Sequence, residues 1–464
     1  MKNKFTIENI KKSINSEQIL EGLFGIEREG LRIHSNGELA LTPHPEIFGD
    51  KLKNPVITTD FSESQIEIVT PCLDSIEKTH NLLNTLTDIV NTNIPENEYF
   101  WNQSLPCILP PFEKIPIAEY REDENSKEAR KYREGLVKKY GTQKQMISGI
   151  HYNFSFGENT IKTLYEKLKT TETYREFKNN IYLKVTRNYL RYGWLIIYLT
   201  GSTIAAHKTF TQECLKQLNK QDKNGGYYSN QGPSIRNGST GYKNLMPLYP
   251  RYDTVENFIT DVKTFIKEGK LTQAKELYTP IRLKPKDNNN LLESLKNDGI
   301  QYVEIRTIDI NPFEKTGISK EDMEFVHLFM IYLLIKDETN YPKWQEEGDK
   351  NVITAAEEGY LDSLLIKDGV EIKLNTWANE ILENIKEINS KLNLNKENII
   401  KVMEDRINNP KNTYGRRLLE LIENNGYLDT NINFALENKD LSIENINKRD
   451  DLLVEYEKIA LFNK

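Results

Sequence analysis

Acidic side chains in the segment ITTDFSESQIEIVTP (57–71) have the types and spacing of metal ligands. Asp60, Glu63 and Glu67 occupy polar positions of a stretch whose β-branched, alternating residues favour a β-strand. Carboxylates gathered on one face of a strand repel one another. Divalent cations that prefer oxygen ligands, such as Mg²⁺ or Mn²⁺, neutralise such a cluster. The segment is therefore a candidate metal-binding strand.

Further segments repeat this alternation of apolar and polar residues. They are FGIEREGL (24–31), SGIHYNFSF (148–156) and GIQYVEIRTIDINPF (299–313). Residues two apart on a strand share a face. The polar faces of these strands would carry Glu27 and Glu29, then His151, Asn153 and Ser155, then Glu304 and Arg306. If all these strands belong to one antiparallel sheet, its apolar face packs on helices and its other face gathers carboxylates, a histidine and an arginine.

The same residues also have an ordinary structural interpretation. A single Glu-x-Glu pair on a strand is more often a solvent-exposed face than a metal site, and a single histidine is more often structural. Repetition on several strands favours a shared function, because each strand would otherwise need its own explanation. Spacing alone leaves both interpretations open.

Composition narrows the class of protein. The 464-residue chain has 38% hydrophobic residues, and its net charge of −7 argues against a general nucleic-acid binder. Its three cysteines, Cys72, Cys107 and Cys214, are far apart, which favours a reduced cytoplasmic protein over a disulfide framework. The apolar stretches 192–206 and 325–335 are shorter than the roughly 18 residues of a membrane span, so we expect buried helices and no membrane partner.

The order of segments predicts an α+β fold. The first 20 residues favour an amphipathic helix and not a signal peptide. Strands are expected in a hairpin at 24–43 with its turn at Asn36–Gly37, and at 57–71, 148–156 and 299–313. Helices are expected at 72–98, 125–140, most of 160–220, and from 320 to the end, with a Gly-rich excursion at 223–242. Length alone allows two lobes or one elaborated domain.

Long motifs identify a resemblance to a known family. The chain resembles bacterial glutamate–cysteine ligases (γ-glutamylcysteine synthetases) in, successively, FGIEREGLRI, ITTDFSESQIEIVTP, YREGLVKKYG, QMISGIHYNFSF, SIRNGSTGY, YTPIR and GIQYVEIRTIDINPF. The resemblance runs in order from about residue 20 to 340. It implies a glutamine-synthetase-like fold, in which a curved, largely antiparallel sheet forms a funnel with helices outside. It also implies one domain over 1–464, with an α+β catalytic core at 1–320 and a mainly helical part at 321–464.

The resemblance also assigns roles to individual residues. The implied metal ligands are Glu27, Glu29, Glu67, His151 and Glu304, with Asp60 as a weaker candidate. The implied substrate residues are Gln145 and Arg236 for glutamate, and Phe61, Tyr132, Tyr242 and Tyr278 for the cysteine pocket. Arg282 and Arg306 would bind ATP phosphates, and Arg306 and Glu304 would act in catalysis.

The implied reaction joins the γ-carboxyl group of glutamate to the amine of cysteine through a γ-glutamyl phosphate, with ATP and Mg²⁺ or Mn²⁺. It is the first step of glutathione biosynthesis. We expect a cytoplasmic monomer whose partners are these small molecules, without nucleic acid. Because the sequence ends after a helix without a second Gly-rich ATP site, we expect the dipeptide only. Two alternatives stay open: a related ligase with another amine acceptor, and a non-catalytic nucleotide- or metal-binding protein on the same scaffold.

Overall fold

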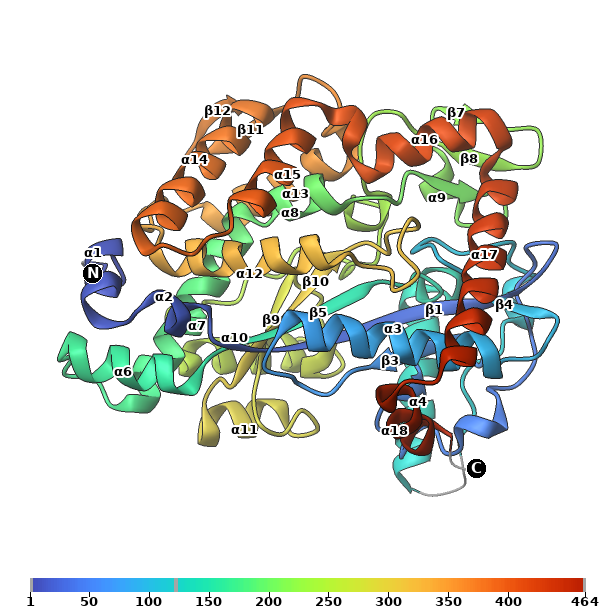
Figure 1. Ribbon diagram of the computed structural model, residues 1–464, viewed down its shortest axis with the longest axis horizontal. Helices are drawn as coiled ribbons and strands as arrows, with labels where there is room; N and C mark the ends of the chain where they lie inside the picture. Colours follow the sequence, from blue (N-terminus) through green and yellow to red (C-terminus); the bar gives the residue numbers. More distant parts are fainter. Residues whose placement is uncertain (1–2, 121–123, 462–464) are drawn as a thin grey trace.

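A central antiparallel sheet organises the molecule (Figure 1). The computed structural model describes residues 3–120 and 124–461. The sheet has seven strands in the order β2-β3-β1-β5-β10-β9, and β4 pairs with one end of β1. The strands are β1 (Gly22–His34), β2 (Ile57–Thr59), β3 (Gln65–Val69), β4 (Glu98–Phe100), β5 (Ile150–Phe156), β9 (Ile281–Lys284) and β10 (Tyr302–Ile308). The α+β class and the shared antiparallel sheet are as predicted.

Helices surround this sheet, and two small sheets lie outside it. The helices are α1 (Ile7–Ser13), α2 (Ser16–Leu20), α3 (Ile76–Asn93), α4 (Glu124–Tyr140), α5 (Thr142–Gln145), α6 (Glu158–Leu168), α7 (Tyr174–Tyr192), α8 (Trp194–Thr200), α9 (Gln212–Leu215), α10 (Val255–Lys267), α11 (Leu291–Asp298), α12 (Lys320–Ile335), α13 (Trp344–Glu358), α14 (Leu374–Leu392), α15 (Glu397–Asn408), α16 (Tyr414–Asn425), α17 (Tyr427–Lys448) and α18 (Asp451–Ala460). The small sheets are β6 (Ala205–His207), β8 (Gly226–Tyr228) and β7 (Lys220–Gln221), and the hairpin β11 (Leu364–Lys367) with β12 (Val370–Lys373).

The register of the main sheet brings polar residues of different strands side by side. Strand β1 pairs with β3 on one side and β5 on the other, and β5 pairs with β10. The cross-strand pairs that matter for function are Glu29 with Glu67, Glu27 with His151, Glu304 with Asn153, and Glu304 with Arg282. The predicted alternation therefore assembles one polar face.

The other face of the sheet packs against helices α3 and α12 (Figure 1). Ile26 is fully buried on this face, and the hydroxyl of Tyr152 donates to the carbonyl of Met323 in α12. Arg28 is buried here too, where it donates to Thr87 Oγ1 and Asn102 Oδ1. Burial lowers the pKa of the Arg28 guanidinium to about 9. The helix-facing side is thus largely apolar, and its buried arginines, Arg28 and Arg32, have their own hydrogen-bond acceptors.

The prediction of a single strand over 57–71 is wrong. This segment forms β2 and β3, joined by a turn that contains Glu63. The Glu63 carboxylate accepts hydrogen bonds from the backbone N–H groups of His44 and Glu119 and pairs with Lys51. These bonds fix the turn, so Glu63 stays away from the polar face.

Two N-terminal predictions also need correction. In place of one helix, residues 7–20 form two short helices, α1 and α2, because Ile14 and Asn15 adopt extended backbone between them. The hairpin expected at 24–43 has its turn, with Gly37 at a φ of 81°, but the returning chain pairs only through the isolated bridge from Ile33 to Leu39. The strands that pair with β1 over several residues, β3 and β5, lie elsewhere in the sequence.

Between residues 320 and 461 the chain is mainly helical, and it also contains the hairpin β11–β12, which was not predicted. Its turn is Asp368–Gly369, with both φ angles positive, a strong hairpin signal that the helical pattern around it obscured. The apolar stretches 192–206 and 325–335 contribute to the buried helices α8 and α12. Among the described residues, no helix combines the length and apolar character needed to cross a membrane.

The C-terminal helices share the core of the sheet region. One cluster of buried apolar residues includes Phe5 near the N-terminus, Ile26 in β1 and Leu461 at the end of the described chain. The single domain expected over 1–464, with parts 1–320 and 321–464, stays a prediction, and this shared core supports it.

A buried ion pair links α12 to the C-terminal helices. Arg406 in α15 donates to Asp322 Oδ1 at 2.6 Å and to the hydroxyl of Tyr414 at 2.7 Å. The Tyr414 hydroxyl in turn donates to Asp322 Oδ2 at 2.7 Å. All three side chains are buried, so each satisfies polar groups that would otherwise have no partner.

Replacing Arg406 by Met should destabilise the protein strongly. The substitution leaves the Asp322 carboxylate buried without its cation, which costs about 3–5 kcal/mol of unfolding free energy. Urea denaturation of the variant measures this loss. Because removing both charges is far less costly, adding Asp322→Leu should recover part of it. A single-variant loss below about 1 kcal/mol would contradict a structural role for the pair.

Candidate active site

The polar face of the sheet forms one wall of a cavity of about 630 Å³. Every residue to which the family resemblance assigns a role lines this cavity: Glu27, Glu29, Phe61, Glu67, Tyr132, Gln145, His151, Arg236, Tyr242, Tyr278, Arg282, Glu304 and Arg306, together with Asp60. They come from β1, β3, β5, β9 and β10, from helices α4 and α5, from the connection between β2 and β3, from the short 3-10 helix Ile235–Asn237, and from the loops of Tyr242 and Tyr278. Segments far apart in the sequence therefore converge on one space.

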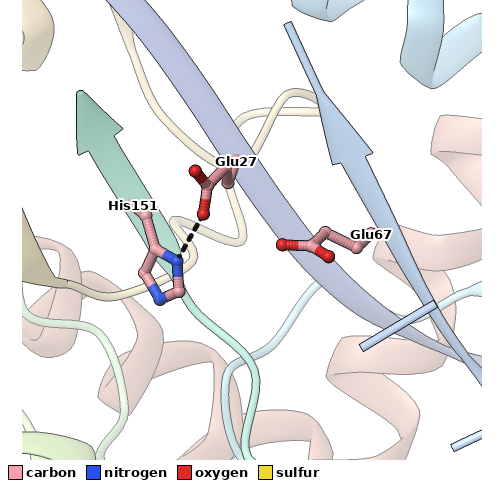
Figure 2. A group of neighbouring side chains, drawn as sticks. All are labelled: Glu27, Glu67 and His151. Carbon is pink, nitrogen blue, oxygen red and sulfur yellow. Dashed lines mark hydrogen bonds and ion pairs between the residues drawn. The ribbon is translucent and has the colours of Figure 1, made fainter. Parts of the chain in front are cut away.

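Three of the proposed metal ligands point toward one another (Figure 2). Glu27, Glu67 and His151 each offer a ligand atom, and these atoms all lie within 4.8 Å of one another. His151 Nδ1 is 3.0 Å from Glu27 Oε2. The other two lie close by, with Glu29 Oε1 3.6 Å from His151 Nε2 and Glu304 Oε1 3.9 Å from His151 Nδ1. His151 is the centre of the proposed set.

Burial and mutual repulsion disturb the protonation of these acids. Burial, with the nearby charge of Asp60, raises the pKa of Glu29 to about 8. Burial, with Glu27 as the next cause, holds the pKa of Glu67 well above its usual value. Burial alone would also raise the pKa of Glu27, but the hydrogen bond with His151 leaves it lowered. Without a cation, the cluster therefore retains protons near neutral pH.

The donor set fits a divalent cation. Burial, and next the charge of Arg306, lower the pKa of His151, so its imidazole is neutral and one ring nitrogen has a free lone pair. Carboxylate oxygens with one neutral imidazole suit Mg²⁺ or Mn²⁺. Such an ion would also replace the protons that Glu29 and Glu67 retain.

Glu304 has a different environment from the other acids. Its Oε1 accepts from Arg306, its Oε2 accepts from Lys284, and Arg282 Nη1 lies 3.8 Å from Oε1. Burial would raise the pKa of Glu304, but these cations, Arg306 first, hold it well below its usual value. The β9–β10 side of the cavity is therefore rich in cations, whereas the β1–β3 side is rich in carboxylates.

Arg236 is held in the cavity by backbone groups and by a glycine. Its Nη2 donates to the carbonyl of Arg306 at 2.8 Å and its Nη1 to that of Ile308 at 3.3 Å. A Cβ on Gly149 would lie 2.0 Å from Arg236 Nη2, so only glycine leaves room for the guanidinium. The N–H of Gly149 also donates to Glu29 Oε2 at 2.9 Å. Gly149 thus contacts both an acid of the cluster and Arg236.

Tyrosines form the opposite wall. The Tyr242 hydroxyl donates to Gln145 Oε1 at 2.8 Å and lies 2.8 Å from the Tyr278 hydroxyl. The rings of Tyr242 and Tyr278 are 4.5 Å apart between centroids. Among the described residues, the buried Nε2 of Gln145 has no hydrogen-bond partner. Gln145 therefore contacts the tyrosines proposed for the cysteine pocket and still has a donor available for a ligand.

Sequence reasoning missed several residues of the cavity. Arg133 donates to the carbonyl of Asp60 at 2.7 Å, and its position beside Tyr132 in YREGL was a usable signal. Asn244 accepts from the Tyr278 N–H at 2.9 Å and donates to the carbonyl of Glu276 at 2.8 Å, so it fixes the tyrosine wall. No sequence pattern predicts these contacts of Asn244.

Two further missed residues had weak signals. Gly149 stands directly before the strand of His151, and Lys284 follows Arg282 at the two-residue spacing of a shared strand face. In both cases the spacing was visible, but the contacts with Arg236 and Glu304 depend on the tertiary fold.

A second, smaller cavity of about 250 Å³ lies toward the other end of the same strands. Leu23 in β1, Asn153 in β5 and Tyr302 in β10 contribute to its lining. Asn153 Nδ2 donates to Glu27 Oε1 at 3.0 Å. The carboxylate cluster, which lines the first cavity, is therefore linked to the lining of the second through Asn153.

Comparison with known proteins identifies the scaffold. The family model described as glutamate–cysteine ligase matches residues 7–272 and 266–354. A glutathione biosynthesis bifunctional protein from Clostridium perfringens is 41% identical over 467 residues, covering 99% of this chain and 58% of the relative. A glutamate–cysteine ligase from Clostridium acetobutylicum is 36% identical, covering 83% of this chain and 87% of the relative. The chain thus spans little more than half the length of the bifunctional relative.

Solved structures agree with these matches. The crystal structure of a glutamate–cysteine ligase from Francisella tularensis in complex with AMP has a TM-score of 0.85 and 27% sequence identity. It matches over 95% of this chain and 92% of that chain. A bifunctional glutathione synthetase from Pasteurella multocida has a TM-score of 0.81 and 29% identity, over 93% of this chain and 54% of that one.

Metal binding to the free protein should strengthen as the pH rises toward about 8. Below that pH, Glu29, whose pKa is about 8, is largely protonated, and a cation must displace the proton. Titration with Mn²⁺, followed by the electron paramagnetic resonance of the free ion, measures the affinity. Glu29→Gln removes this titration and should make the curve flatter below about pH 8. An affinity of the unaltered protein that does not change with pH would contradict this assignment.

Proposed function

The chain belongs to the glutamate–cysteine ligase family, and on that premise we propose that it uses ATP to join the γ-carboxyl group of glutamate to the amine of cysteine. One observation carries this proposal. A single cavity contains an acidic cluster suited to a divalent cation, a group of cations beside it, and a tyrosine wall with an unpaired amide donor. An acid-activating ligase needs each of these parts.

The chemistry explains why the parts must be adjacent. A carboxylate does not react with an amine, because oxide would have to leave. Transfer of the γ-phosphoryl group of ATP to the carboxylate makes an acyl phosphate, from which phosphate leaves when the amine attacks. A Mg²⁺ or Mn²⁺ ion at Glu27, Glu67 and His151, with Glu29 and Glu304 beside them, would neutralise phosphate charge.

The protein's own side chains would bind and orient the nucleotide. Arg306 and Arg282 bring fixed positive charge beside the cluster, and Arg306 is suited to stabilise the transferring phosphoryl group. The second cavity, largely apolar and next to Glu27 through Asn153, is suited to the adenosine part. We therefore propose that ATP binds with its adenosine part in the second cavity and its phosphates along the carboxylate cluster, so that the γ-phosphate points toward the first cavity.

The amino acids would occupy the first cavity. Arg236 is proposed to bind the α-carboxylate of glutamate, and the free Nε2 donor of Gln145 supports a second polar contact to a substrate. Phe61, Tyr242 and Tyr278 are proposed to hold the cysteine side chain, because aromatic rings favour a polarisable sulfur. ATP and reduced cysteine are both available in the cytoplasm, which is the proposed location.

An assay of the purified protein tests the function. ATP consumption is measured with glutamate, Mg²⁺ and a panel of acceptors that includes cysteine, serine, glycine and putrescine. We expect turnover only when glutamate and a good acceptor are both present, with cysteine best. The Glu67→Gln variant should lose about a hundredfold or more in turnover, because it removes a charge from the cluster. Preference for another amine would favour a related ligase, and no ATP consumption would favour a non-catalytic binding protein.

Replacing Gly149 by Ala should selectively impair glutamate binding. The added Cβ would lie 2.0 Å from Arg236 Nη2, so the guanidinium must move. The KM for glutamate should rise about tenfold or more, while the KM for ATP changes little. The matched control is Gly135→Ala, because no atom lies within 4 Å of a Cβ at that helical position. Equal changes in both KM values would indicate a general distortion of the site.

The tyrosine wall should set the acceptor order. Cysteine should be used best, 2-aminobutyrate next and serine least, within the roughly 1–3 kcal/mol that an apolar pocket can discriminate. Tyr242→Phe keeps the ring and should preserve this order. Tyr242→Ala removes the ring and should weaken cysteine and 2-aminobutyrate together. Side-by-side kcat/KM values measure the order, and serine ranking above cysteine would refute the pocket assignment.

A further inference from the structure

Lys284 occupies a position that the proposed mechanism has not used. It lies in β9, and its ammonium group donates to Glu304 Oε2. Glu304 is its one hydrogen-bond partner among the described residues. The other oxygen of Glu304, Oε1, accepts from Arg306. Both oxygens of this proposed metal ligand are therefore occupied by side-chain cations.

This arrangement conflicts with metal binding by Glu304. A cation at the Glu27, Glu67 and His151 cluster would face Glu304, whose Oε1 lies 3.9 Å from His151 Nδ1. The ammonium of Lys284 competes for the same carboxylate. The two positive charges repel each other and compete for Glu304, so each weakens the binding of the other.

Lys284 is better able to move away from Glu304 than Arg282 is. The Nε and Nη2 groups of Arg282 donate to the backbone carbonyls of Leu277 and Lys275, which fix its guanidinium. Lys284 has no such backbone contact among the described residues. A lysine carries a compact charge on a flexible stem with donors that rotate, whereas an arginine presents a rigid fork.

The location of Lys284 brings it near a second partner, the phosphates of a bound nucleotide. Lys284 lines the first cavity, and Tyr302, directly opposite it in β10, lines the second. The ammonium therefore lies at the boundary of the two cavities. This is where the phosphates of a nucleotide would lie if its adenosine occupied the second cavity.

We propose that Lys284 exchanges partners: it neutralises Glu304 in the free protein, and binds the β- and γ-phosphates of the nucleotide when the metal takes Glu304. The proposal rests on the proposed function for the identity of the nucleotide. In the free protein, Lys284 would compete with the metal for Glu304. In the protein with metal and nucleotide bound, it would be a phosphate ligand. Removing its charge should therefore change the two affinities in opposite directions.

Binding measurements on Lys284→Met test this without any turnover. In the absence of nucleotide, Mn²⁺ should bind the variant at least about threefold more tightly than the unaltered protein, because a nearby cation is gone. With saturating Mn²⁺, a non-hydrolysable ATP analogue should bind about tenfold or more weakly, because a charged hydrogen bond is lost. AMP, which lacks the β- and γ-phosphates, should bind almost unchanged.

Controls separate the proposal from a structural effect. Lys284→Arg keeps the charge and should bind the analogue within a few-fold of the unaltered protein. Lys296→Met, an exposed position in α11, should change neither affinity. Circular dichroism checks the fold, and Lys284→Gln replaces the Met variant if that one does not fold. The ligase assay on the unaltered protein tests the proposed function separately.

Two outcomes would overturn the proposal. Weaker Mn²⁺ binding by the variant would mean that Lys284 only orients Glu304 for the metal. Unchanged affinity for the ATP analogue, or an equal loss for AMP, would exclude contact with the β- and γ-phosphates.

Discussion

Strand β1 lies between β3 and β5, and its register with both decides which side chains face the cavity. Because side chains alternate, a shift of one residue would turn Glu27 and Glu29 into the core and bring Arg28 out. The helix-facing side resists such a shift, since Ile26 is fully buried and Arg28 donates to Asn102. The packing of the helix-facing side therefore fixes the register of β1. This register keeps mutually repelling acids close together on the cavity-facing side.

Negative and positive side chains of the cavity come from different strands. Within the part of the chain that the structure describes, Glu27, Glu29 and Glu67 form no ion pair with a lysine or arginine, and burial, with Glu27 as the next cause, raises the pKa of Glu67. Cations from β9 and β10 surround Glu304 and hold the pKa of its carboxyl well below its usual value. One part of the site therefore favours a metal ion and the other favours phosphate. Strand β5 joins them, because His151 contacts acids from both β1 and β10.

The alternation of apolar and polar residues was sufficient to predict the polar face, because successive side chains of a strand point to opposite faces of the sheet. The division of 57–71 into β2 and β3 was not predictable in this way, since it depends on the distant partners Lys51 and Glu119 of Glu63. Family motifs supplied the roles of Arg236 and the tyrosines, which spacing could not. Neither alternation nor motifs could predict the contact of Gly149 with Arg236, because it is a steric contact between two segments that meet only in the folded protein.

The pairing of β1 with β5, and of β5 with β10, has a consequence for synthesis on the ribosome. The acids of β1 and β3 emerge early, whereas Glu304 and its cations follow only after more than half of the chain. Contacts between such distant segments form slowly, because a long loop must close first. Until β10 is synthesised, β1, β3 and β5 can form only an incomplete sheet, with acids on one face and an open edge on β5. The charge of that sheet would itself discourage pairing with another copy.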